Sequence, residues 1–142
     1  MPLCAYSNQL YTHFAGSAVH FDNDQHNQNH NDFGLEYEFK QRSRSIYSAR
    51  VNHFVNSGGN NSTFLAATGK RCHQTSGTMR ACAGIMAGLL NGYRRINNYG
   101  FFPVALPYVT VDYRVTGFDL GCVPAFNGYS GFCFVSAKLR LF

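Results

Sequence analysis

The sequence predicts an all-β protein, an eight-stranded antiparallel up-and-down transmembrane β-barrel. Three features predict this fold: strand-like runs follow one another without a convincing helix, long and short connections alternate, and charged residues are scarce. Charged residues make up 13% of the chain, about half of the roughly 25% that is usual in soluble proteins. Composition alone fits a soluble β-sandwich equally well, so the strands and their connections decide between the two.

The strands are expected in eight runs rich in β-branched and aromatic residues, separated by clusters of turn-forming residues. The runs are close to the roughly 9–11 residues that a tilted membrane strand requires. No run of about 18 apolar residues occurs in the sequence, which excludes a transmembrane helix. The expected strands are 10–21, 33–40, 46–55, 63–70, 79–90, 103–113, 116–123 and 132–142.

The connections alternate between long, polar or glycine-rich segments and short links. Outer-membrane barrels have this pattern, with long loops outside the cell and short turns in the periplasm. An even number of strands would then place both ends of the barrel domain on the periplasmic side. The long connections are expected at 22–32, 56–61, 91–102 and 124–131, and the shorter ones at QRSRS, at RVT and at an intermediate link, 73–78.

The two ends of the chain also fit an envelope protein. Residues 1–7 are interpreted as the remnant of a signal peptide, with a natural N-terminus as the alternative, and residues 8–142 as a single barrel domain. The terminal Phe142 resembles the assembly signal of bacterial outer-membrane barrels. Lys138 and Arg140 would share its face, and we expect them to snorkel toward the membrane interface unless the register shifts.

Four cysteines form two pairs, Cys72 with Cys82 and Cys122 with Cys133, each of which could lie across one hairpin. Disulfides would fit an oxidising envelope compartment. Free thiols fit the spacing equally well, because sequence does not fix the distance between two Cα atoms. Neither pair has the spacing of a zinc ribbon.

The strand expected at 103–113 contains two prolines, Pro103 and Pro107, which cannot donate hydrogen bonds to a β-ladder. In a closed barrel every strand has two neighbours, so these prolines are expected to open the ladder locally. Pro124, just after the following strand, would widen the same seam between the sixth and seventh strands.

The C-terminal third, PVALPYVTVDY…FDLGCVP…NGYSGF…KLRLF, resembles the last three strands of the outer-membrane lipid A palmitoyltransferase (PagP-like) family. Upstream, DFGLEYEF at 32–39, IYSARVNHFVNS at 46–57 and AVHF at 18–21 are more loosely similar to its first three strands. The family's Asp-Ser pair is Asn-Ser here, and tryptophan, frequent in the family, is absent. The matching positions in the last three strands are Pro103, Val104, Leu106, Pro107, Val111, Tyr113, Phe118, Val123, Pro124, Asn127, Gly128 and Phe142.

The resemblance implies transfer of an acyl chain from a phospholipid to lipid A, with catalytic residues at His20, Asn56 and Ser57. His20 would be the base, and Ser57 a nucleophile or a hydrogen-bond partner. Asn56 cannot be the anion that steadies an imidazolium. Either Asp22 or Asp24 supplies that carboxylate, or Asn56 donates to the oxyanion, or the activity is weak or lost.

Further residues are expected to contact the lipids. In the resembling family a proline-flanked gap, here Pro107 and Pro124, is a lateral entrance for lipid. Gly69, together with other small residues predicted to face inward (Ala67, Gly84 and Gly88), would leave room for the acyl chain. Arg94 and Arg95 in the third long connection could pair with lipid A phosphates, although an ordinary solvated loop explains them more simply.

The expected partners are the lipids of a bacterial outer membrane, a phospholipid donor and a lipid A acceptor, and we expect a monomer. No nucleic-acid partner is expected, because the lysines and arginines are scattered despite a net charge of +5. No metal or cofactor is expected, since His20, His26 and His30 are only weak evidence of a metal site. The alternatives are a non-catalytic surface or structural barrel of the same fold and a soluble lipid-binding barrel.

Overall fold

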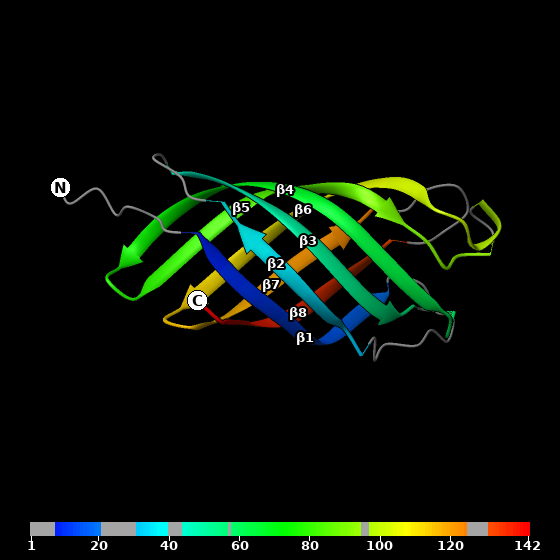
Figure 1. Ribbon diagram of the computed structural model, residues 1–142, viewed down its shortest axis with the longest axis horizontal. Helices are drawn as coiled ribbons and strands as arrows, with labels where there is room; N and C mark the ends of the chain where they lie inside the picture. The colour runs from blue at the N-terminus through cyan, green and yellow to red at the C-terminus, as the bar shows by residue number, and fades with distance from the viewer. Residues whose placement is uncertain (1–7, 21–30, 40–43, 57, 95–96, 125–130) are drawn as a thin grey trace.

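In the computed structural model, eight antiparallel strands form a closed barrel in which each strand pairs with the next and β8 pairs with β1 (Figure 1). The structure describes residues 8–20, 31–39, 44–56, 58–94, 97–124 and 131–142. The strands are β1 (Gln9–His20), β2 (Phe33–Glu38), β3 (Ser45–Val55), β4 (Asn61–Ser76), β5 (Met79–Leu90), β6 (Phe102–Tyr113), β7 (Thr116–Val123) and β8 (Phe132–Arg140), with one 3₁₀ turn, η1 (Asn97–Tyr99), before β6.

The predicted all-β fold, strand number and strand order are therefore confirmed, and most boundaries agree within two residues. The exception is β4, which continues to Ser76 instead of ending at Lys70. The intermediate link expected at 73–78 is in fact a tight turn at Gly77–Thr78. The extension occurs because β4 and β5 stay paired, through a register shift between Gln74 and Ser76, past Cys72 and Cys82, which are joined by a disulfide.

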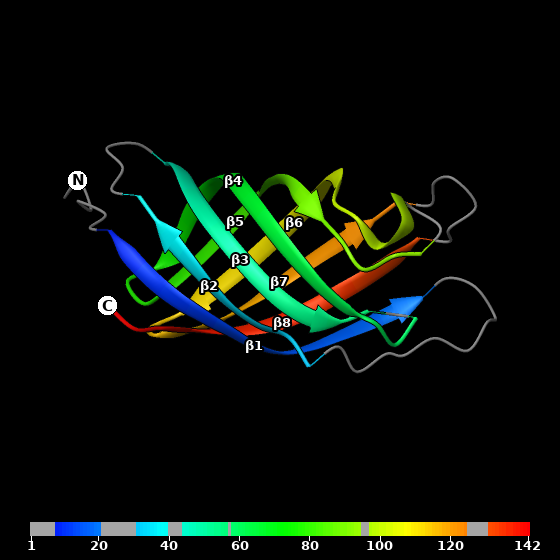
Figure 2. The ribbon, with the colours of Figure 1, turned by 45° about the vertical axis from the view of Figure 1, so that its right-hand side comes forward.

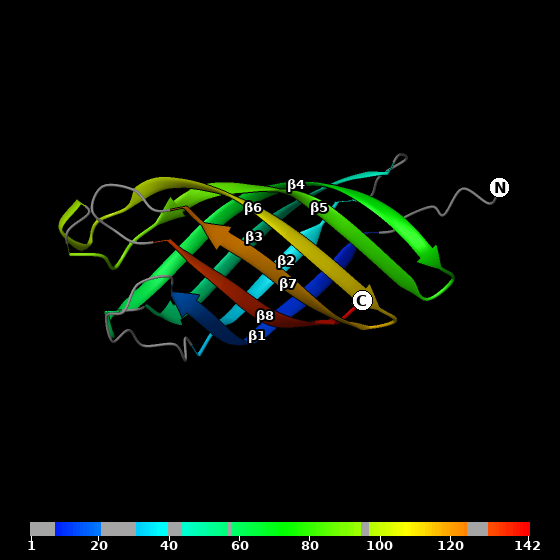
Figure 3. The ribbon, with the colours of Figure 1, turned by 180° about the vertical axis from the view of Figure 1, so that it is seen from behind.

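The two ends of the barrel differ. The start of β1 and the end of β8 lie at one end, together with the turns that join β4 to β5 and β6 to β7 (Figure 1). We call this the turn end. The opposite end, where β1 and β3 finish and β4 and β6 begin, is the loop end, and the view from behind shows the same arrangement (Figure 3).

Side chains alternate between the inside and the outside of the wall. In β3, for example, Ile46, Ser48, Arg50 and Asn52 are buried, whereas Tyr47, Ala49 and Val51 between them are exposed. Large apolar side chains cover the outside: Ile85 and Phe118 are each 60% exposed. Among the described residues the structure has no helix with the length and apolarity needed to cross a bilayer. Further outward-facing apolar side chains are Phe14, Leu35, Tyr47, Val51, Leu65, Leu89, Val109, Val111, Tyr113, Leu120 and Val135.

Two of the ladders are incomplete toward the loop end. β6 pairs with β7 only from Tyr108 to Tyr113, so its first six residues, Phe102–Pro107, pair with β5 alone. This opening between β6 and β7 confirms the expectation drawn from the prolines. The β1–β2 ladder likewise ends at Phe14, after which β1 is bulged and pairs only with β8 (Figure 2).

Both cysteine pairs form disulfides between directly opposed residues, which resolves the alternative left open by the spacing. Cys72 and Cys82 are buried against Ile46 inside the barrel. Cys122 and Cys133 join β7 to β8 at the loop end, beside the opening between β6 and β7.

The expectation that Lys138 snorkels toward the interface is wrong. Lys138 is 1% exposed and points into the barrel. Its Nζ lies 2.9 Å from Asp112 Oδ1 and 3.3 Å from Asp119 Oδ1. The side chain faces inward because β8 keeps its alternation from Ser136 through Lys138, so a cation on the inner face meets carboxylates instead of headgroups.

Candidate functional site

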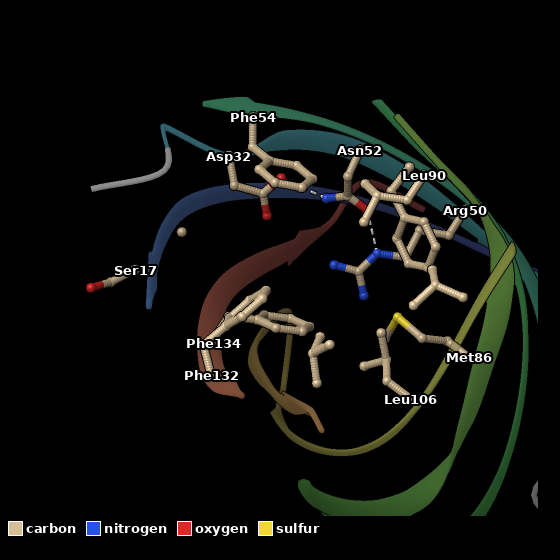
Figure 4. A pocket seen from close by; sticks show the side chains of 14 residues that line it. Ser17, Asp32, Arg50, Asn52, Phe54, Met86, Leu90, Leu106, Phe132 and Phe134 are labelled. Atoms are coloured by element: carbon tan, nitrogen blue, oxygen red, sulfur yellow. Dashed lines mark hydrogen bonds between the residues drawn. The ribbon is translucent and has the colours of Figure 1, made fainter. Parts of the chain in front are cut away.

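The loop half of the barrel contains an apolar cavity (Figure 4). About 600 Å³ of its space is not filled by atoms, part of it at an open mouth. The wall comes from inward positions near the loop ends of β3 to β8, where the strands carry aromatic and aliphatic residues. These residues are Phe54, Phe64, Met86, Leu90, Val104, Leu106, Val123, Phe132 and Phe134.

A glycine on β7 helps to shape this cavity. A Cβ on Gly121 would lie 2.6 Å from Phe134 Cζ and 2.9 Å from Leu106 Cδ1. Gly121 therefore leaves the space that the Phe134 ring and the Leu106 side chain occupy from neighbouring strands. A larger residue there would push both side chains into the cavity.

The small residues proposed from the sequence do not line the cavity. Ala67 is exposed on the outside, and a Cβ on Gly69 would meet the outward ring of Tyr47, so both were wrongly predicted to face inward. A Cβ on Gly84 or Gly88 would instead collide with the backbone of β4. It would lie 2.1 Å from the carbonyl oxygen of Gly69 in the first case and 1.8 Å from that of Leu65 in the second. These two glycines allow close approach of β4 and β5.

The floor of the cavity is polar and closed. Arg50 enters it from β3 (Figure 4), and its Nη1 donates to Asp119 Oδ2 at 2.6 Å. Its Nε also donates to the side chain of Asn52. Below this floor, His13 Nε2 lies 2.9 Å from Glu36 Oε2. The cavity is therefore a blind pocket that ends on an ion pair.

The turn half of the barrel is filled by ion pairs. Lys70 pairs with Glu38 and lies 3.4 Å from Glu36, while Arg80 Nε donates to Asp112 at 2.9 Å. All these groups are buried, and their charges balance among the described residues. The four cations are Arg50, Lys70, Arg80 and Lys138, and the four carboxylates are Glu36, Glu38, Asp112 and Asp119.

Asp32 completes the cavity wall beside β1. Its Oδ1 accepts a hydrogen bond from Asn52 Nδ2 at 2.7 Å, and its Oδ2 accepts one from Ser136 Oγ at 2.8 Å. A Cβ on Gly16 would lie only 2.5 Å from the Cβ of Asp32. Asp32 thus links β3 to β8 beyond the end of the β1–β2 ladder. Gly16 on β1 leaves the space that the Asp32 side chain occupies.

The cavity adjoins the opening between β6 and β7. Val104 and Leu106 line the cavity from the part of β6 that β7 does not pair, and Val123 lines it from the end of β7. Because β6 and β7 are not paired along this stretch, only side chains separate the cavity from the outside of the barrel here. The exposed Pro107 and Pro124 flank the same stretch, as expected.

The structure brings the backbones of two of the three predicted catalytic residues, His20 and Asn56, to the loop end of the barrel. His20 is the last residue of β1, paired with Phe132, and Asn56 directly follows β3. The side chain of His20 and all of Ser57 lie outside the described residues. Asp22, Asp24, His26, His30 and Arg95 also lie outside them, whereas Arg94 is exposed near the loop end.

Asn56 is buried, and its side chain organises the loops. Its Nδ2 donates to Ser62 Oγ at 2.9 Å and to the carbonyl oxygen of Gly92 at 2.7 Å. Its Oδ1 accepts from the backbone amides of Gly58 and Asn60, at 2.9 and 3.1 Å. Both amide hydrogens are engaged, which argues against Asn56 as an oxyanion donor. A carboxylate could not donate to Gly92, so the contact explains asparagine at this position.

Among the described residues, one cluster has the composition of a metal site: His13, Glu36 and Asp119, with ligand atoms within 4.8 Å of one another. Arg50, Lys70 and Lys138 already pair with its carboxylates. Adding a metal cation would place further positive charge beside these cations, so the cluster suits an ion-pair network better than a metal site.

Sequence reasoning did not identify Arg50, Asp32 or the phenylalanines of the cavity. The available signal was alternation: Arg50, Asn52 and Phe54 are inward positions of one strand, and their change from polar to apolar marks the floor. No protein-family model matches the chain, and no curated protein is similar to it at a significant level.

Proposed function

We propose that this protein is a monomeric barrel of the bacterial outer membrane that takes an acyl chain of a membrane lipid into the cavity of its loop half. The proposed reaction is transfer of that chain from a phospholipid to lipid A of lipopolysaccharide. One observation carries the proposal: a blind apolar cavity adjoins a stretch of wall without a backbone ladder.

The outer surface supports the membrane location. Large apolar side chains cover the outward face of all-antiparallel strands in a closed barrel, which leaves no unpaired sheet edge along most of the wall. In hydrocarbon, backbone groups must be satisfied within the protein, and closed barrels meet this requirement. The cost of the opening at Phe102–Pro107 is reduced because the two prolines have no N–H to leave unpaired.

The cavity suits an acyl chain better than a polar ligand. Its wall is aromatic and aliphatic, and three of its few polar side chains, Arg50, Asn52 and Asp32, already hydrogen-bond with one another. Burial of each methylene of a chain there would contribute about 0.8 kcal/mol. A chain entering between β6 and β7 would pass Leu106 and Val123 and reach Met86 and Arg50 at the floor.

In the proposed chemistry, His20 accepts the proton of an attacking hydroxyl, either that of lipid A directly or that of Ser57. The oxygen attacks the ester carbonyl of the phospholipid, the bond from that carbonyl to the glycerol oxygen breaks, and the leaving oxygen takes the proton from His20. If Ser57 attacks first, a lipid A hydroxyl then attacks the acyl-serine in the same way. Asn56 acts by holding the loop that carries Ser57.

A non-catalytic lipid-binding barrel is the second candidate. The engaged amide of Asn56 favours it, because no carboxylate stands where the resembling family has one and no amide hydrogen is free. Both candidates require the cavity to bind a chain, and only the first requires an acyl product.

The test is incubation of the refolded protein with phospholipid and lipid A in detergent, followed by mass spectrometry of lipid A. We expect lipid A to gain the mass of one acyl chain, and His20→Ala to abolish this gain. No gain under conditions where a lipid A palmitoyltransferase is active would reject the enzyme. Leu106→Trp, which fills the cavity from its wall, should abolish both transfer and chain binding.

The membrane location is tested separately. Folding in detergent with heat-modifiable gel mobility would support a membrane barrel. Recovery of a folded monomer without detergent would instead identify a soluble lipid-binding barrel, the second of the two alternatives that the sequence leaves open.

A further inference from the structure

A shallow groove runs across the outside of β4, β5 and β6 near the turn end. Two rows of outward side chains cross these strands. In the first row, Arg71 on β4 lies opposite Ala83 on β5, which lies opposite Val109 on β6. In the second row, His73 on β4 lies opposite Ala81 on β5, which lies opposite Val111 on β6. Two alanines therefore form the floor on β5, between cationic or polar side chains on β4 and valines on β6.

Arg44 extends the cationic wall of this groove. It precedes β3, and its carbonyl oxygen accepts a hydrogen bond from the backbone amide of Cys72 at 2.8 Å. Its side chain is exposed and lines the groove together with that of Arg71. Two guanidinium groups thus stand on one side of an apolar floor.

Among the described residues the acidic side chains are confined to the inside of the barrel, whereas cationic side chains lie both inside and outside. Glu36, Glu38, Asp112 and Asp119 are buried, and Asp32 is bound by Asn52 and Ser136. Arg44, Arg71, Arg94 and Arg114 are exposed, whereas no described aspartate or glutamate side chain is. Arg44 and Arg71 therefore have no acidic neighbour on the outer surface within the described part of the chain, and a ligand could supply the negative charge.

We propose that this groove binds an anionic phospholipid of the leaflet at the turn end. Its phosphate lies between Arg44 and Arg71, and one of its acyl chains lies over Ala81 and Ala83. Guanidinium groups bind phosphate oxygens through paired hydrogen bonds, and the small side chains let the chain approach the wall closely. This inference rests on the membrane location proposed above.

The headgroup class follows from the charges. A zwitterionic headgroup brings an ammonium group as well as a phosphate, and no described aspartate or glutamate side chain on the outside could receive it. A glycerol headgroup brings net negative charge alone, which complements the two arginines. The site is distinct from the interior cavity, whose lining comes from inward positions of the loop half.

The test measures lipid bound to the refolded protein by native mass spectrometry in a neutral detergent. The probes are phosphatidylglycerol and phosphatidylcholine with identical acyl chains. We expect tighter binding of phosphatidylglycerol, and the double variant R44Q/R71Q should weaken it about 25-fold, since each arginine near an anionic headgroup contributes a factor of about five. Ala83→Leu, which fills the floor and keeps both charges, should also weaken it.

Two matched controls accompany these variants. Arg114→Gln removes an exposed arginine at the same end but outside the groove, and Ala87→Leu enlarges an exposed alanine on the same strand outside it. Both should leave phosphatidylglycerol binding unchanged. If Arg114→Gln weakened phosphatidylglycerol binding as much as R44Q/R71Q, the effect would be one of general surface charge, and the proposed site would be overturned. Equal affinity for phosphatidylglycerol and phosphatidylcholine would overturn it as well.

The outcomes separate this inference from the proposed function. If phosphatidylglycerol is not preferred but Leu106→Trp still abolishes binding of an acyl chain, the groove is overturned and the interior site stands. If Ala83→Leu and R44Q/R71Q weaken phosphatidylglycerol binding while Leu106→Trp changes nothing, the groove stands and the interior site falls.

Discussion

The two halves of the barrel interior share one backbone architecture and have opposite chemistry. In the turn half, four cations and four carboxylates fill the space and pair with one another. In the loop half, aromatic and aliphatic side chains surround a cavity. The ladder beside the cavity is incomplete, whereas β6 and β7 pair along the whole turn half.

This difference separates structural support from binding. The interior of an eight-stranded barrel is usually just filled by side chains, and the turn half follows that rule with ion pairs. The filled, charged half gives the cavity a floor at Arg50, which Asp119 holds in place. The apolar half is left incompletely filled and partly unpaired at its wall, which suits a site that admits a ligand from the side.

The largest effect is expected from Asp119→Ala in the turn half. The substitution leaves Arg50 without its carboxylate and removes one partner of Lys138. Losing one partner of a buried ion pair costs about 3–5 kcal/mol. Urea unfolding in lipid vesicles measures this cost. An effect below about 1 kcal/mol would show that the network contributes little to stability.

The two disulfides offer a comparison between the halves. The double variants C72S/C82S and C122S/C133S open loops of nearly equal length, with sequence separations of 10 and 11, so each should cost about 3 kcal/mol. Only Cys122–Cys133 holds the end of β7 beside the opening. Only its loss should change the rate of acyl-chain binding, measured by stopped-flow with a fluorescent phospholipid. Equal rates in both variants would contradict this.

A smaller effect is expected from Asn56→Asp at the rim of the loop half. The carboxylate cannot donate to the Gly92 carbonyl oxygen, and it faces that oxygen at close range. The free energy of unfolding should fall by about 1–3 kcal/mol, with no gain in acyl transfer. A stable variant with raised transfer activity would show that this position needs a catalytic acid and would overturn the structural role of Asn56.

The smallest effect on stability is expected from Pro107→Ala together with Pro124→Ala. Both prolines are exposed, and their replacement restores backbone donors that could extend the β6–β7 ladder. The unfolding free energy should change by less than about 1 kcal/mol, while acyl-chain entry slows. Unchanged transfer kinetics would remove the entrance between β6 and β7 from the account.

Much of the fold was predictable because strands and turns are local signals. Alternation and turn residues located all eight strands, and two prolines were enough to locate the opening beside β7. The chemistry of the interior was not predictable in the same way. Lys138 looked like an interfacial cation because its carboxylate partners, Asp112 and Asp119, lie on other strands.

The candidate site shows the same limit. The hydrogen bonds of Asn56 involve Gly92, 36 residues away, so only the assembled barrel reveals that its amide is engaged. The inner or outer orientation of Gly69 depended on alternation counted through β4 and was predicted wrongly. Position relative to the loop end was predictable, whereas contacts across the barrel were not.

The most direct test of the account uses a phospholipid with a photoactivatable diazirine at the end of one acyl chain. After illumination of the refolded protein in vesicles of this lipid, the labelled residues are identified by peptide mass spectrometry. If the chain occupies the cavity, the label should appear at Met86, Leu106 or Arg50, and Leu106→Trp should abolish it. Labelling confined to outward residues such as Phe118 and Leu120 would contradict the binding of an acyl chain inside the barrel.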